Sequence, residues 1–162
     1  MPMLRELVVS VAAAAVCMLL GAAIYEAVVM APNFELGTQA LEHARGFLVV
    51  STPAAFFRVL APTVQILLAL SIVLTWRTLA GRRRLLLFAA LGAAIAADVV
   101  TFAFHYPRNA VLFVAPLDRS SAELQRIARE WAWGNDVRIL LLVGAAVAAF
   151  SAVHCVARRP GP

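Results

Sequence analysis

The chain has 162 residues, of which 63% are hydrophobic, and its mean hydropathy is +0.87. Soluble domains are nearer half apolar, so these values exclude an ordinary water-soluble domain. The net charge of +5 comes from arginines alone, half of them in short segments beside long apolar runs. This pattern is typical of membrane topology signals, so we expect contact with membrane lipid and no nucleic-acid partner.

Four apolar runs are each about as long as the ~20 residues that a helix needs to cross a bilayer. They are rich in Ala and Leu, lack the alternation of strands, and cover residues 7–31, 59–79, 85–104 and 137–156. Backbone groups in lipid must be satisfied internally, which favours helices. We predict an all-α integral membrane four-helix bundle, with residues 1–162 forming a single transmembrane domain. The first run is too long for the apolar part of a signal peptide, so we expect it to be retained.

The two long connections are predicted to carry short surface helices. In residues 33–58, apolar side chains recur every three or four positions, a weak amphipathic pattern formed by Leu36, Ala40, Ala44 and Phe47. In the second connection, Ser120 and Glu123 form a capping-box signature. An apolar stripe follows at Leu124, Ile127, Ala128 and Trp131. Gly134-Asn135 is expected to end this helix or to bend it into the fourth run.

The arginines also predict the topology. One side carries a dense set in short segments with Glu6 as its only acid, namely Arg5, Arg77, Arg82, Arg83, Arg84, Arg158 and Arg159. Because arginine density near the span ends favours the cytoplasm, we expect both termini there and both long connections outside. Residues 80–84 then form a tight basic turn between antiparallel helices. The absence of Lys beside abundant Ala and Arg is typical of a GC-rich genome, which favours a bacterial plasma membrane.

A polar cluster is expected near the outer membrane face. Asp98 and His105 are seven residues apart, so they share one helix face about 10 Å apart. A carboxylate in a spanning helix is costly and usually has a partner or a function. Glu26 lies at a depth similar to that of His105. The residues expected to meet in one pocket are Glu26, Asp98, His105, Asn109, Asn135 and Arg138, covered by the helix that carries Trp131.

Each of these residues also has a purely structural interpretation. Glu26 and His105 could contact headgroups or water, and Asp98 could pair with another helix. Trp131 could be an aromatic-belt anchor, and Arg138 could anchor the start of the fourth helix.

No cofactor is expected. One histidine with carboxylates, as in Glu26 and His105, could hold a divalent ion, but the Glu-x-x-His motif of di-iron bundles is absent from the sequence. The sequence also lacks a nucleotide-binding glycine loop and a Cys-x-x-Cys pair. Cys17 and Cys155 are expected to be free thiols because they differ in depth.

Two helix ends are similar to each other. The first run ends with Tyr25-Glu26 and Pro32-Asn33, and the third with His105-Tyr106-Pro107-Arg108-Asn109, where Pro107 is expected to break the helix. A duplicated helix pair is one interpretation and chance is the other.

The segments Pro107-Arg-Asn109-Ala-Val-Leu112 and Trp131…Asn135-Asp-Val-Arg138 resemble the anthrone oxygenase-like family of small four-helix membrane proteins. The resemblance implies four spans and oxidation of anthrones to anthraquinones without a bound organic cofactor. It assigns site positions to Pro107, Asn109, Trp131 and Arg138.

The sequence therefore favours a membrane oxidoreductase that acts on an apolar aromatic phenol, anthrone or quinol. In this hypothesis His105 or Glu26 is the base, and Arg138 and Asn109 stabilise the resulting anion. Trp131 stacks on the substrate. Two alternatives stay open, namely a non-enzymatic scaffold or accessory subunit and a small proton-coupled transporter. Small residues at 92–97 permit close contact between chains, so a homo-oligomer also stays open.

Overall fold

The chain folds into long helices in a computed structural model that describes residues 2–76 and 81–155. Four helical segments are long and apolar enough to cross a membrane, namely Met3–Phe34, Pro53–Thr75, Gly81–Val114 and Ser121–His154. No strand occurs in the described part of the chain. The predicted all-α membrane bundle is therefore confirmed. The predicted basic turn at 80–84 is wrong for residues 81–84, which form the first turn of the third membrane helix. Residue 80, Arg77, Arg158 and Arg159 lie outside the described residues.

The membrane helices are built from several elements. The first comprises α1 (Pro2–Tyr25), the π-helical turn η1 (Glu26–Met30) and α2 (Ala31–Phe34). After α3 (Thr38–Phe47), the second is α4 (Pro53–Thr75). The third comprises α5 (Gly81–Val100), η2 (Thr101–His105), α6 (Tyr106–Asn109) and η3 (Ala110–Val114). The fourth is α7 (Ser121–His154).

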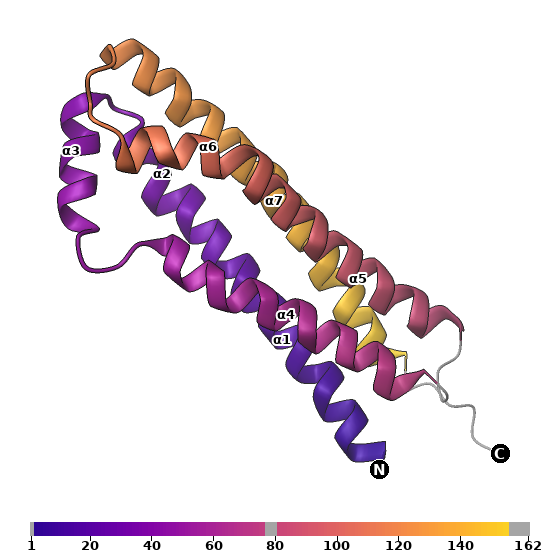
Figure 1. Ribbon diagram of the computed structural model, residues 1–162. Coiled ribbons are helices and arrows are strands. Elements are labelled where there is room, and N and C mark those ends of the chain that lie inside the picture. Colours follow the sequence, from indigo (N-terminus) through magenta and orange to yellow (C-terminus); the bar gives the residue numbers. More distant parts are fainter. Residues whose placement is uncertain (1, 77–80, 156–162) are drawn as a thin grey trace.

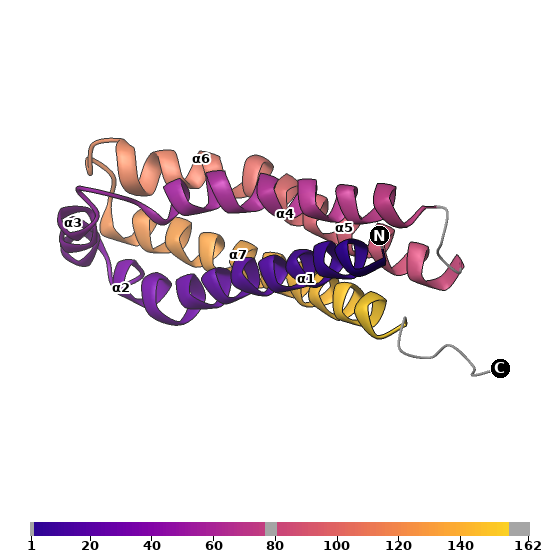
Figure 2. The same cartoon turned by 90° about the horizontal axis from the view of Figure 1, so that it is seen from below.

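The long helices run side by side, and α3 lies across one end of them (Figures 1 and 2). The start of α1 and the end of α7 lie at the opposite end (Figure 1). Helix α7 packs against α1 and α5, and α4 packs against the same two helices. Alanines such as Ala12, Ala90 and Ala145 fill much of the core and are fully buried. Small side chains permit this close packing of membrane helices.

Two prolines, Pro32 and Pro107, change the hydrogen-bond register of the first and third membrane helices without ending them. Proline lacks an N–H and its ring clashes with the carbonyl four residues earlier. The chain responds with i→i+5 bonds just before each proline, from Ala31 N–H to the Glu26 oxygen and from Tyr106 N–H to the Thr101 oxygen. The expected break at Pro107 is therefore wrong, because the helix continues to Val114. The two similar helix ends share this order of a π turn and then an α-helix with proline in second position.

Helix α7 is continuous, so Gly134-Asn135 does not end it. The Ser120 hydroxyl accepts a hydrogen bond from Glu123 N–H at 3.2 Å, which confirms the predicted cap. A helix of 34 residues is about 51 Å long, whereas the hydrocarbon layer is about 30 Å thick. The charged first turns of α7 therefore project beyond the lipid instead of forming a separate surface helix.

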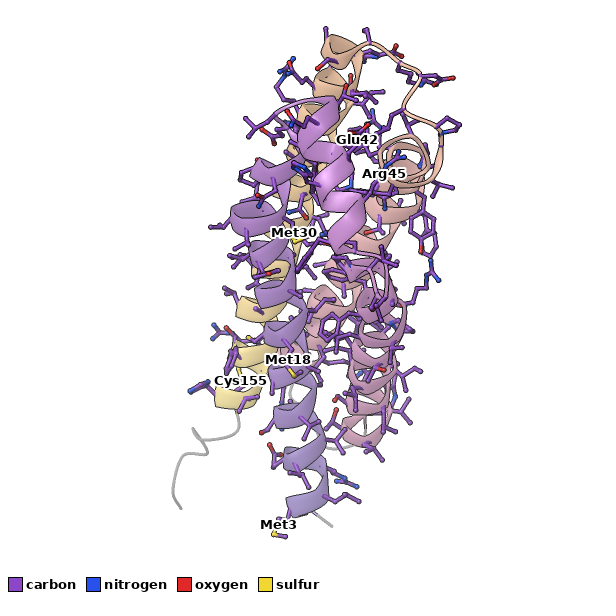
Figure 3. The ribbon with its side chains drawn as sticks, turned by 90° about the vertical axis from the view of Figure 1, so that its left-hand side faces the viewer. Met3, Met18, Met30, Glu42, Arg45 and Cys155 are labelled. Atoms are coloured by element: carbon purple, nitrogen blue, oxygen red, sulfur yellow. The ribbon has the colours of Figure 1, made fainter. Side chains whose placement is uncertain are left out.

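Helix α3 covers the end of the bundle through Leu41 and the expected Ala44, which packs against the apolar cluster there. Leu41 is fully buried, whereas Leu36 and Phe47 are 78% and 83% exposed. Arg45 donates to the carbonyl oxygens of Leu112 at 2.8 Å and Val111 at 3.1 Å. Figure 3 shows Arg45 on the side of α3 that faces this helix end. These contacts attach α3 to the end of the third membrane helix.

An ion pair that the sequence analysis missed lies near the other end of the bundle. Arg83 is buried and donates to both carboxylate oxygens of Glu6, at 3.0 and 2.6 Å. It links α5 to α1, so Arg83 is more than a topology signal.

Candidate functional site

A cavity of about 700 Å³ lies between the four membrane helices in the half of the bundle next to α3. This volume is within the range of small-molecule sites. Six of the seven site residues expected from the sequence line it, namely Glu26, Asp98, His105, Asn109, Trp131 and Arg138. Asn135 does not line the cavity but accepts a hydrogen bond from Arg138. The rest of the wall is mainly apolar, with Leu19, Phe57 and Leu142 among its members.

Arg138 and Glu26 form a buried ion pair in the cavity wall. Arg138 Nη2 donates to Glu26 Oε2 and to Asn135 Oδ1, and Asn135 Nδ2 donates to the Ala23 oxygen at 3.0 Å. The three residues are at most 6% exposed. A buried charge needs such partners, and these contacts link the middle of α7 to the first helix.

The Arg138 guanidinium also lies over the Phe57 ring, 4.7 Å from its centre. Its Nε atom is buried and has no hydrogen-bond partner within the described residues. The Nε donor of the guanidinium is therefore left unused. Arg138 lies well inside α7, so it does not anchor the start of this helix.

The two motif residues Asn109 and Trp131 contact each other. Trp131 Nε1 donates to Asn109 Oδ1 at 2.7 Å. The indole packs edge-on against His105 and Phe34, with ring centres 5.2 Å apart in each pair. Trp131 is 4% exposed, so its ring is part of the cavity wall. The aromatic-belt interpretation fits the 63% exposed Trp133 better.

His105 is 1% exposed and lies between η2 and α7. Its Nδ1 is 3.5 Å from the Val100 oxygen, a weak contact. Its Nε2 is buried and meets no described group in hydrogen-bonding geometry, although the Trp131 backbone is near. The ring therefore has one nitrogen whose hydrogen-bonding capacity is unused.

Gly134 permits this arrangement, which sequence reasoning did not foresee. A Cβ atom at Gly134 would collide with the Phe104 ring and would lie 3.3 Å from His105 Cε1. The missing side chain lets η2 approach α7 closely. A glycine inside a predicted helix was the available signal, but Gly134 was expected to end the helix or to bend it.

Asp98 lies deeper in the bundle, about two turns from His105. It is partly buried and accepts a hydrogen bond from Gln65 Nε2 of α4. Arg138 is near enough to influence both Asp98 and His105 through its charge. Gln65 also lines the cavity and was missing from the expected site. A polar amide inside an apolar run was the signal for it.

The described residues contain no group of three or more His, Cys, Asp or Glu side chains that could hold a metal ion. Glu26, one of the two ligands considered, is engaged by Arg138. The expectation that the site uses no cofactor stays a prediction.

No protein-family model, curated protein or solved structure matches the chain. The resemblance to the anthrone oxygenase-like family therefore depends on the residues quoted above.

Proposed function

We propose that the chain is an oxygenase-like membrane oxidoreductase that takes an apolar aromatic phenol, anthrone or quinol into this cavity. One observation carries the proposal: two cavity residues each hold a buried polar atom without a partner, Arg138 Nε and His105 Nε2. An unsatisfied buried group costs about 1–3 kcal/mol. In this proposal, a bound ligand with an oxygen and an acidic hydrogen supplies the partners that these two atoms lack.

The residues divide into a donor and candidate bases. The Arg138 Nε–H donates to the substrate oxygen and stabilises the negative charge that develops there. Glu26 is a weaker candidate base than the sequence suggests, because Arg138 already engages it. Asp98 receives only an amide hydrogen bond, so it is the better placed carboxylate. The unused His105 nitrogen is the other candidate for the proton.

The anion then transfers electrons to molecular oxygen. For an anthrone, the methylene carbon becomes a carbonyl with one oxygen atom, and the second oxygen leaves as water with the two methylene hydrogens. For a quinol, both hydroxyl protons and two electrons go to oxygen, which gives the quinone and hydrogen peroxide. The residues remove a proton, hold the anion and exclude bulk water.

The test is oxygen uptake by the protein in nanodiscs with a panel of anthrones and quinols. We expect Asp98→Asn, His105→Gln and the double variant Glu26→Gln/Arg138→Met to lower the rate of oxygen uptake. The variant that removes the main donor or base should lower this rate by about 10²–10³-fold. Glu6→Gln, which changes the remote ion pair, is the control and should stay within about twofold of wild type. Wild-type uptake no faster than that of the double variant overturns the proposal.

One observation favours a non-enzymatic alternative, a scaffold or accessory subunit. Glu26, Asn135 and Arg138 largely satisfy one another and link α7 to the first helix. If that is their whole role, the double variant changes thermal stability while no phenol, anthrone or quinol binds to the wild type. Ligand-induced stabilisation of the wild type that Asp98→Asn abolishes contradicts this alternative.

A further inference from the structure

The residues that line the cavity differ in how exposed they are. The lining residues from the first helix and from α7 are buried or, for Met30, partly buried. Lining residues that are exposed lie on α4 and on the third membrane helix. They are Arg58, Pro62, Phe102, Tyr106, Ala110 and Val114. Thr52, which directly precedes α4, is also an exposed residue that lines the cavity.

These residues form two rows. Phe102, Tyr106, Ala110 and Val114 are spaced by four residues, and so are Arg58 and Pro62. Residues at this spacing lie on one face of a helix. Since every member both lines the cavity and is exposed, the two rows are candidate edges of a slot that connects the cavity with the outside of the bundle.

We propose that this slot is a lateral entrance from the bilayer and that the ligand is an amphiphile. Its aromatic ring lies in the cavity, and an apolar chain leaves through the slot into the lipid. This inference builds on the proposed function and narrows its substrate class to phenols or quinols that carry an alkyl chain.

The other sides of the cavity are closed by the contacts described above. The Glu26–Arg138 ion pair closes the side of the first helix and α7. Gly134 lets the third membrane helix meet α7 directly. At the end of the bundle, Phe34 packs against Trp131, and Arg45 holds α3 in place. A large ligand therefore enters with least disruption between α4 and the third membrane helix.

The chemistry of the slot matches an amphiphile. Its deeper part is apolar, with Pro62 and Phe102, and the Phe102 ring is 61% exposed. The polar side chains of the slot are the exposed Arg58 on α4 and the 40% exposed Tyr106 on the third membrane helix, whereas Ala110 and Val114 follow Tyr106 toward α3. Arginine and tyrosine favour the headgroup region, whereas apolar side chains favour the acyl chains. An alkyl chain therefore leaves along the apolar side chains, and polar substituents face Arg58 and Tyr106.

The length of the slot also suits a chain rather than a compact ligand. Phe102 and Val114 are twelve residues apart, which corresponds to roughly 18 Å along a helix. A compact aromatic molecule fits within the cavity volume of about 700 Å³ and has no need of so long an opening. A long alkyl chain attached to the ring exceeds the cavity and requires one.

The test uses naphthol with a dodecyl chain that carries a photoreactive diazirine, irradiated with the protein in nanodiscs. We expect labelling of Phe102, Tyr106 or Pro62, and we expect excess plain naphthol to remove this labelling. Ala110→Trp fills the slot and should lower the labelling by about tenfold, which corresponds to ~1.4 kcal/mol. The matched control is Ala103→Trp, an exposed alanine on the same helix that does not line the cavity. It should change the labelling by less than about twofold.

The outcomes separate the inference from the proposed function. If naphthol stabilises the protein against heat but the chain labels all lipid-facing helices equally, without competition, the lateral entrance is wrong and the proposed function stands. Equal labelling of the Ala110→Trp and Ala103→Trp variants also overturns the entrance. If naphthol neither stabilises the protein nor competes, both proposals fail.

Discussion

The buried ion pair between Glu26 and Arg138 allows a quantitative prediction. Glu26→Gln removes the anion and leaves the Arg138 guanidinium buried in the cavity wall, where it is 5% exposed. Breaking a buried pair in this way costs about 3–5 kcal/mol. We expect about 3 kcal/mol, the lower end of that range. The reason is that Asn135 and the Phe57 ring still contact the guanidinium.

For a chain of this size, 1 kcal/mol corresponds to about 2–4 °C in the unfolding midpoint, so Glu26→Gln should lower Tm by about 6–12 °C. The double variant Glu26→Gln/Arg138→Met removes both charges and should lose less than Glu26→Gln alone. Thermal unfolding in detergent, followed by circular dichroism, measures these shifts.

The matched control is the other interhelical ion pair. The Glu6 side chain is 40% exposed, so water reaches its end of the pair, and Glu6→Gln should cost less than Glu26→Gln although it also leaves a buried arginine, Arg83. If Glu26→Gln unfolds at the same temperature as Glu6→Gln, or if the double variant is no more stable than Glu26→Gln, the reasoning about the buried pair is refuted.

Three further variants test the packing around the cavity. Gly134→Ala should destabilise the protein by about 1–3 kcal/mol because the new Cβ meets the Phe104 ring. Gly144→Ala, where the new Cβ meets open space, should be neutral or stabilising by up to about 1 kcal/mol. Equal thermal unfolding midpoints of the two variants contradict the close contact at Gly134. Arg45→Gln should speed hydrogen exchange in α3, because two hydrogen bonds hold that helix, and unchanged exchange speaks against the attachment. Trp131→Phe should cost about 1 kcal/mol through the lost indole hydrogen bond, which urea or SDS unfolding measures, and an unchanged stability refutes that bond.

The fold class was predictable because the length of each apolar run fixes its role in a bilayer. The positions of the helix ends were less predictable. Proline was interpreted as a break, since its ring and missing N–H disfavour an α-helix. At Pro32 and Pro107 the chain instead adopts π turns, which keep both helices continuous. The sequence does not show which response a given proline will cause.

The candidate site could be predicted as a set of residues but not as pairs. Depth along the helices placed Glu26, His105 and Arg138 at one level. The rotation of each helix decides which side chains meet, and that depends on packing at residues such as Gly134. The pairing of Gln65 with Asp98 was missed for the same reason.

The most direct measurement of the central claim is the location of a bound bromonaphthol by anomalous diffraction from crystals of the protein grown in lipid. The account predicts a bromine peak inside the cavity between α4 and α7, with the naphthol oxygen within hydrogen-bonding distance of Arg138 Nε. Bromine peaks that lie on the lipid-facing surface, with none in the cavity, would contradict it.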